Sequence, residues 1–90
     1  MVKIRNWPFN GLCDFLKDYG FRESHIEGSH HFYNGTIKGV QRVVQVIFSK
    51  KEKKAQSYKT MKMAIRHSGI DKKYFDEWKN NKVVHSEIIY

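Results

Sequence analysis

The sequence predicts an α+β domain in which helices pack on one face of an antiparallel sheet. Apolar residues recur at helical spacing in residues 10–20 and again in residues 57–68. Three β-prone segments lie between these two stretches, at residues 21–27, 29–34 and 42–48. The predicted order is therefore α-β-β-β-α, followed by a short third helix and a β-prone C-terminal stretch. The 90 residues form one domain, because no linker, repeat or low-complexity tract divides them.

The first helix has both a start signal and a stop signal. Asn10 is the predicted N-cap, because an asparagine side chain accepts a hydrogen bond from a free backbone N–H. Gly20 ends the helix, because glycine adopts the left-handed conformation that follows many helices. The apolar face between these two signals consists of Leu12, Phe15, Leu16 and Tyr19.

The β-prone segments are bounded by turn residues. Residues 21–27 form the first predicted strand, and residues 29–34 form the second. The dipeptide Asn34-Gly35 is a turn signal at the end of the second strand. Residues 42–48 form the clearest strand, because apolar and polar residues alternate there. Its apolar face consists of Val44, Val46 and Phe48.

Two further helices follow, each with a capping residue. Ser57 caps a helix that runs to Ser68 and is closed by Gly69. The apolar stripe of this helix consists of Tyr58, Met61, Ala64, Ile65 and Ser68. Asp71 caps the shorter third helix, whose aromatic residues are Tyr74, Phe75 and Trp78. Residues 83–90 form either an extra edge strand or an ordered tail.

Composition excludes several classes of protein. No apolar run approaches the roughly 20 residues that span a bilayer. The single cysteine, Cys13, cannot form an intramolecular disulfide, and the spacing of a zinc site is absent. We therefore expect a cytoplasmic protein without a metal ion and without a membrane segment.

The charge of the chain predicts an anionic partner. Lysine and arginine number 17 against 9 aspartate and glutamate, which gives a net charge of +8. The isoelectric point is near 9.7 and the mean hydropathy is −0.68. A small domain this basic favours nucleic acid first and an anionic membrane second. Solubility alone is the competing explanation.

The cations gather in one part of the chain. An advance of about 100° per residue places one group together on the side of the second helix opposite its apolar stripe. This group consists of Lys59, Lys62 and Arg66, and just upstream of it stand Lys50, Lys51, Lys53 and Lys54. Phosphate binding requires clustered cations, because each neutralised phosphate releases condensed counterions. We expect these residues to contact nucleic-acid phosphates, with an ordinary solvated helix face as the alternative.

Two adjacent histidines, His30 and His31, are candidates for proton transfer. The ordinary pKa of imidazole suits proton transfer near neutral pH, which accelerates a reaction by typically about 10²–10⁴-fold. A structural hydrogen bond is the alternative role. A shared metal ion is disfavoured, because neighbours on a strand point to opposite faces. In a regular strand His30 shares a face with Phe32, the expected core face. Either His30 therefore lies in the entry turn, or His31 is the exposed histidine.

Three short motifs follow one another along the chain in a recognisable order. They are Gly20-Phe21 at the end of an amphipathic helix, Gly28-Ser29-His30 at the start of a strand, and Ser68-Gly69-Ile70 at the end of a later helix. A β strand at residues 43–48 and a basic segment lie between the second and third motifs. Over residues 10–70 this pattern resembles the HicA (YcfA-like) toxins of bacterial and archaeal toxin–antitoxin pairs.

The resemblance implies a fold similar to double-stranded-RNA-binding domains and the activity of an mRNA interferase. It implies that His30 is the catalytic residue, with Ser29 and His31 beside it as RNA contacts. It also implies a HicB antitoxin that covers the active face, and no metal ion or organic cofactor. Many members carry a Pro-x-His after the third strand, whereas residues 47–51 here read Ile-Phe-Ser-Lys-Lys. Lysines would then supply the cationic role.

Two alternatives to an RNA-cleaving toxin stay open at this point. One is a non-catalytic module of the double-stranded-RNA-binding type, and the other is a basic protein whose partner is an acidic protein. The resemblance leaves residues 71–90 outside its minimal unit. These residues either cover the core of a small sheet or contact a partner.

Overall fold

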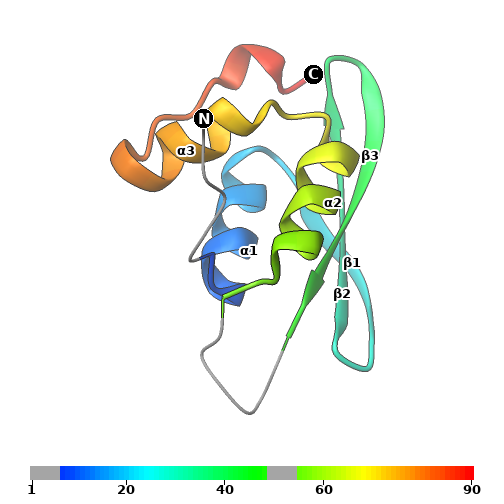
Figure 1. Cartoon of the computed structure of the whole chain (residues 1–90). Coiled ribbons are helices and arrows are strands. Elements are labelled where there is room, and N and C mark those ends of the chain that lie inside the picture. The colour runs from blue at the N-terminus through cyan, green and yellow to red at the C-terminus, as the bar shows by residue number, and fades with distance from the viewer. Residues whose placement is uncertain (1–6, 49–54) are drawn as a thin grey trace.

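The computed structural model describes residues 7–48 and 55–90, and its elements follow the predicted order (Figure 1). The elements are α1 (Phe9–Asp18), β1 (Arg22–Glu27), β2 (His30–Ile37), β3 (Val40–Ile47), α2 (Tyr58–Ser68) and α3 (Lys72–Asn81), with a short 3₁₀ turn at Ser86–Ile88. The described strands form an antiparallel sheet in the order β1-β2-β3. The predicted α+β fold is therefore confirmed.

Helix α1 begins earlier than predicted. Its N-cap is Pro8, whose carbonyl accepts the Leu12 N–H at 3.0 Å, and no side chain of the described residues caps the helix. The prediction of Asn10 as N-cap is wrong, because the extended Pro8 already starts the first turn and Asn10 lies inside it. The predicted end is confirmed: Gly20 has a φ of +83°.

Strands β2 and β3 are longer than predicted and meet at a different turn. The two-residue connection is Lys38-Gly39, where both residues have positive φ, 51° and 77°. The turn predicted at Asn34-Gly35 is wrong, because Gly35 lies inside β2 opposite Arg42. Its glycine serves packing instead, since the ring of Phe21 leaves no room for a Cβ there.

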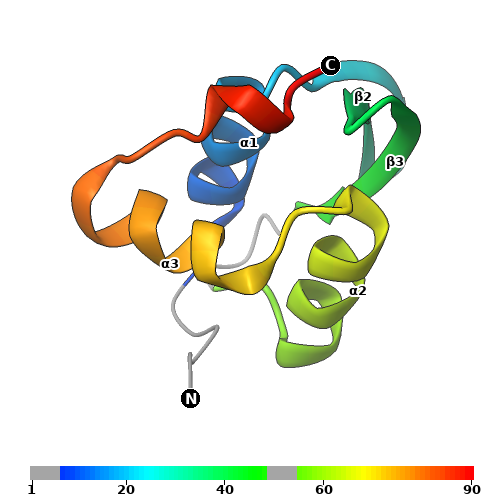
Figure 2. The same ribbon diagram turned by 90° about the horizontal axis from the view of Figure 1, so that it is seen from above.

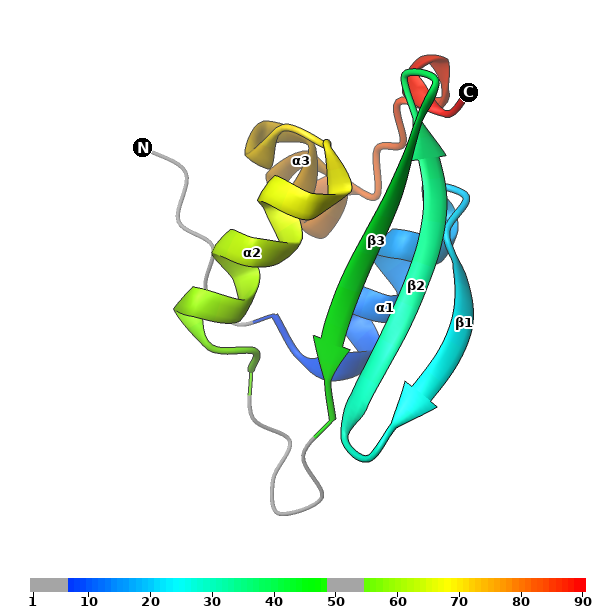
Figure 3. The ribbon, with the colours of Figure 1, turned by 90° about the vertical axis from the view of Figure 1, so that its right-hand side faces the viewer.

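One face of the sheet packs on α1 while the other face is open (Figure 3). Tyr33 and Ile37 of β2 and Val44 and Val46 of β3 are buried on the inner face. The predicted burial of Val44 and Val46 is confirmed, but Phe48 follows the end of β3 and is 39% exposed. Helix α2 packs alongside β3.

Helix α2 has the predicted caps. The Ser57 hydroxyl accepts the Thr60 N–H at 3.1 Å, and Gly69 ends the helix in the left-handed conformation. The predicted stripe is buried at Met61, Ala64 and Ser68. Tyr58 is an exception at 65% exposure. As the first helical residue it stays on the outer surface, where its ring lies 5.4 Å from the Lys62 Nζ.

Helix α3 packs on the side of α1 away from the sheet (Figure 2). Asp71 caps it as predicted, accepting the Lys73 N–H at 3.1 Å. Its buried residues, Phe75 and Trp78, join Phe15 and Trp7 in an aromatic cluster. The Trp7 and Trp78 rings stack at 5.6 Å, and the Phe15 and Phe75 rings stack at 4.0 Å. The extension beyond residue 70 therefore covers the core.

The C-terminal stretch is an ordered tail, and the alternative of an edge strand is wrong. Lys38 N–H donates to the Ile88 carbonyl at 2.8 Å, and Gly39 N–H donates to the Tyr90 carbonyl. These bonds reach only the β2–β3 turn and do not continue along a strand edge. No helix among residues 7–48 and 55–90 has the length and apolar character required to cross a membrane.

Candidate functional site

His30 lies on the open face of the sheet, at one end of it. It is the first residue of β2, directly after the Gly28-Ser29 turn, and it pairs with Glu27 of β1 and Ile47 of β3. The Ser29 carbonyl accepts the Phe48 N–H at 2.8 Å, which extends the β2–β3 pairing to this turn. The His30 side chain is exposed, and no hydrogen bond holds its ring within the described residues.

The two adjacent histidines point to opposite faces, and His30 is the exposed one. His30 shares a face with Phe32 as expected, but the expectation that this is the core face is wrong. The core forms on the other face because α1 covers Tyr33 and Ile37. His31 points to that inner side, where its Nδ1 lies 2.8 Å from the Glu23 Oε2.

His31 is confined by its surroundings. Its side chain is 17% exposed, and its ring packs edge-on against Phe9 with the ring centres 4.9 Å apart. A ring held between a carboxylate and an aromatic side chain has a structural role, and it lies on the opposite side of the sheet from His30. The structure therefore does not bring His31 together with the open face.

His25 is a second imidazole on the open face, and the sequence alone did not single it out. Its ring stacks on Phe32 with ring centres 4.4 Å apart and an interplanar angle of 5°. Its Nε2 lies 3.7 Å from the Glu27 Oε1. On this end of the open face, His25 and Glu27 of β1 thus lie opposite Phe32 and His30 of β2.

A β-bulge places His25 there. Glu23 pairs with Tyr33 and His25 pairs with Phe32, so Ser24 is an extra residue without a partner of its own. In regular alternation from the buried Phe21, His25 would fall on the inner face. The bulge reverses the alternation of side chains between the two faces of the sheet, so that His25 lies on the open face. The Ser24 hydroxyl stabilises the bulge by donating to the Phe32 carbonyl at 3.1 Å. Neither the apolar spacing of the sequence nor its turn and capping residues indicate this bulge.

A groove of about 520 Å³ separates the open face from α2. Its sheet side consists of Phe32, Val43 and Gln45, and its helix side consists of Lys59, Thr60, Met63, Ala64 and His67. Among the described residues, Lys59 is therefore a predicted cation that the structure places across the groove from Phe32. The groove combines apolar surface with the Gln45 amide, the Thr60 hydroxyl, the His67 imidazole and the Lys59 ammonium group.

The other predicted cations lie elsewhere or outside the described residues. Lys62 and Arg66 are exposed and line an adjoining hollow on α2, which shares Lys59 and Met63 with the groove and also includes Tyr58. Lys50, Lys51, Lys53 and Lys54 lie outside the described residues.

The chain on either side of residues 49–54 is held at the His30 end of the sheet. Before this segment, Phe48 bonds to Ser29. After it, the Gln56 side chain accepts the Ile47 N–H at 3.1 Å and donates to the Ile47 carbonyl at 2.7 Å. Since Ile47 pairs with His30, the described residues that flank positions 49–54, Phe48 and Gln56, lie near the Gly-Ser-His turn.

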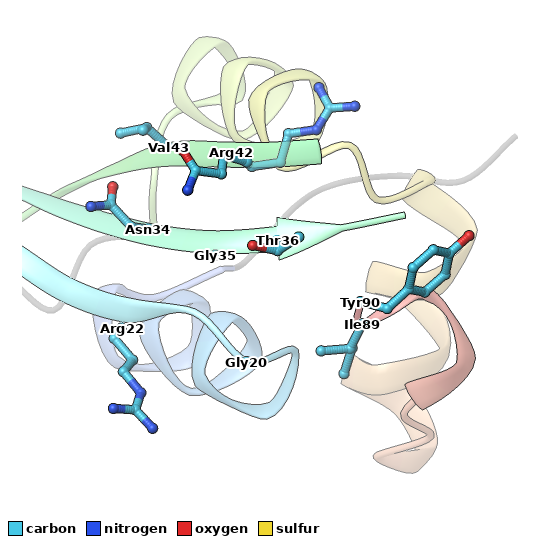
Figure 4. A pocket seen from close by; sticks show the side chains of 10 residues that line it. Gly20, Arg22, Asn34, Gly35, Thr36, Arg42, Val43, Ile89 and Tyr90 are labelled. Carbon is cyan, nitrogen blue, oxygen red and sulfur yellow. The ribbon is translucent and has the colours of Figure 1, made fainter. Parts of the chain in front are cut away.

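A second cleft, of about 480 Å³, lies near the opposite end of the sheet, and its two arginine side chains do not converge (Figure 4). Arg22 and Arg42 line it, but their side chains extend in opposite directions. The Arg42 guanidinium packs instead against Gly69 at the end of α2. The cleft therefore offers no convergent anion site.

The remaining titratable contacts are structural. Burial raises the pKa of the Cys13 thiol, and burial likewise raises the pKa of the Tyr33 hydroxyl that bonds to it. In the C-terminal segment, hydrogen bonding to Glu77 raises the pKa of His85. Among residues 7–48 and 55–90, no group of three or more histidine, cysteine, aspartate or glutamate side chains is arranged to hold a metal ion.

Comparison with protein-family models, curated proteins and solved structures gave no match to this chain.

Proposed function

We propose that this protein is an RNA-cleaving toxin of the HicA type, in which His30 acts at the reacting phosphate. The observation that carries the proposal is the position of His30 at the exposed end of an open sheet face, beside the His25–Phe32 ring pair and the groove that Lys59 lines. An imidazole free of other partners among the described residues is able to exchange a proton with a substrate.

The proposed reaction uses the RNA's own 2′-hydroxyl. Removal of its proton lets the 2′-oxygen attack the neighbouring phosphorus, and the 5′-oxygen leaves with a proton. His30 takes the first proton or supplies the second. DNA lacks the 2′-hydroxyl, so this chemistry separates RNA from DNA as substrate.

The open face offers complementary groups for a single strand of RNA. Unstacked bases pack on aromatic rings, and the His25–Phe32 pair presents such rings at the surface. Lys59 supplies a charge for a phosphate across the groove from Phe32. We propose as further RNA contacts Ser29, Lys62, Arg66 and the lysines at positions 50, 51, 53 and 54.

The proposal includes a protein partner. An antitoxin of the HicB type would inhibit the reaction by covering the open face, where Val43 of β3 leaves apolar surface exposed. The net charge of +8 favours an acidic partner surface.

A non-catalytic RNA-binding module is the second candidate. The α-β-β-β-α order and the surface ring pair favour it, because stacking and phosphate contacts need no proton transfer. The two candidates differ in what His30 does. Binding alone survives its replacement, whereas cleavage does not.

The test compares the wild type with His30→Ala and His31→Gln on single-stranded RNA in excess EDTA, with circular dichroism as a check of the fold. We expect the wild type to cleave and His30→Ala to bind RNA without cleaving it. His31→Gln is the control, because glutamine keeps a partner for Glu23 on the inner face. Full cleavage by His30→Ala, or loss of wild-type activity in EDTA, contradicts the mechanism. RNA binding without any cleavage by the wild type establishes the second candidate.

A further inference from the structure

We propose that His25 is a second catalytic residue, which protonates the leaving oxygen while His30 accepts the proton of the attacking hydroxyl. This inference rests on the proposed cleavage of RNA and goes beyond it by assigning the acid and the base to two named imidazoles. It is carried by the bulge in β1, which places both histidines on the same face of the sheet.

The register of β1 and β2 places His25 and His30 diagonally opposite each other on the open face. His25 lies opposite Phe32, and His30 lies two residues from Phe32 on the same face. Such diagonal neighbours across an antiparallel pair are about 7–8 Å apart at the backbone, which is within reach of ring side chains. Two imidazoles so placed can each approach a different oxygen of one phosphodiester to the roughly 2.6–3.2 Å that proton transfer requires.

Local contacts hold the His25 ring without covering it. The ring stacks on Phe32, and its Nδ1 lies 3.3 Å from the Ser24 hydroxyl oxygen. The side chain is nevertheless 55% exposed, so a substrate can reach it. A ring that is oriented by stacking and open to solvent is suited to direct contact with a bound phosphodiester.

The charges around His25 suit the role of proton donor. Glu27 places a carboxylate oxygen 3.7 Å from its Nε2, which compensates the positive charge of a protonated ring. Within the described chain, His30 has no partner of this kind, which suits the role of proton acceptor. Among residues 7–48 and 55–90, the ionisable groups on or facing the open face are Arg22, Glu27 and His30 on the strands and Lys59 and His67 on α2.

The proposed step balances in atoms and charge. The neutral His30 ring takes the proton of the 2′-hydroxyl, and the 2′-oxygen forms a bond to phosphorus. The bond from phosphorus to the 5′-oxygen breaks, and that oxygen takes its electron pair and a proton from protonated His25. The products are a 2′,3′-cyclic phosphate and a 5′-hydroxyl, and solvent exchange resets both rings.

The test uses ring-preserving substitutions. His25→Phe keeps the stack on Phe32 but cannot transfer a proton. His85→Phe is the matched control, because His85 also stacks on an aromatic ring, Tyr74, at 4.3 Å, in the C-terminal segment. Single-turnover cleavage of a short single-stranded RNA is measured from pH 5 to pH 9. Binding is measured on the same oligonucleotide with a 2′-deoxy nucleotide at the cleaved position.

We expect a bell-shaped pH profile for the wild type and for His85→Phe. In His25→Phe the rate falls by about 10²–10⁴-fold and the loss of activity at alkaline pH disappears, while binding of the deoxy oligonucleotide is unchanged. His25→Gln, which loses the ring as well, must show the same change of profile, and it replaces His25→Phe if that variant fails to fold.

The outcomes separate this inference from the proposed function. If the wild type does not cleave RNA, the proposed function fails and this inference fails with it. If the wild type cleaves and His30→Ala does not, but His25→Phe keeps the full rate and both limbs of the profile, only the assignment of His25 is overturned. A fall in binding that accounts for the whole loss of rate also overturns it, because His25 would then serve stacking alone.

Discussion

The ring of Phe21 occupies the space in front of Gly35: a Cβ built at position 35 lies 2.6 Å from the Phe21 Cγ. Phe21 is buried in the core, so a methyl group at position 35 would overlap an enclosed ring. The contact joins the connection between α1 and β1 to β2 on the inner face of the sheet.

This contact predicts that Gly35→Ala destabilises the fold. We expect the free energy of unfolding in urea to fall by about 1–3 kcal/mol, as for other overpacked cores. The double variant Gly35→Ala/Phe21→Leu should lose less than the sum of the two single variants, because the smaller side chain makes room for the new methyl group. A Gly35→Ala variant as stable as the wild type would show that the strand shifts freely.

The α2 cations predict a change in the salt dependence of RNA binding. Replacing Lys59, Lys62 and Arg66 together with glutamine should lower the slope of log affinity against log salt by about 2, because each contact with single-stranded phosphate contributes about 0.7. Lys59→Gln alone should lower it by about 0.7, since Lys59 lines the groove of the open face. Thermal stability should change little, because all three side chains are exposed.

The matched control for the salt titration is Lys72→Gln, which removes one exposed charge from α3. Its slope should equal that of the wild type. If the triple variant also keeps the wild-type slope and affinity, then these cations are an ordinary solvated surface and RNA binds elsewhere.

The contact between His85 and Glu77 predicts a pH-dependent term in stability. The Nε2 of His85 lies 2.6 Å from the Glu77 Oε1, and this hydrogen bond raises the pKa of His85 above its ordinary value of 6.5. Because the pKa of His85 is higher in the folded state than in the unfolded state, protonation of His85 stabilises the fold. This stabilisation is complete below the unfolded-state pKa, and it is lost as the pH rises through the folded-state pKa.

Urea unfolding of the wild type and Glu77→Gln at pH 5.5 and pH 8.5 measures this term. The wild type should exceed the variant in stability by more at pH 5.5 than at pH 8.5. An equal difference in stability at both pH values would mean that the contact with Glu77 does not raise the pKa of His85.

Local signals predicted the elements whose ends are set by local bonds. Ser57 and Asp71 cap their helices through their own side chains, and Gly20 and Gly69 end helices through their own backbone. These bonds span a few residues, so the sequence reveals them. The turn at Asn34-Gly35 was wrong for the opposite reason, because the need for glycine comes from Phe21, which is distant along the chain.

The candidate site was predictable only in part. The sequence predicted a proton-transfer role for His30 but left open which of His30 and His31 is exposed. The answer depends on which face of β2 the helix α1 covers, and this is a property of the tertiary packing. His25 was missed because strict alternation places it inside, and only the pairing of β1 with β2 shows the extra residue at Ser24.

That extra residue also affects how this chain should be aligned with others. A chain that forms β1 without the bulge has one residue fewer between its counterparts of Phe21 and Phe32. An alignment of the two without a gap at Ser24 therefore matches His25 and Glu27 to positions whose side chains face the helices. The histidine and the carboxylate would then look like unrelated substitutions in a core strand. A single gap at Ser24 restores the correspondence of the open-face positions.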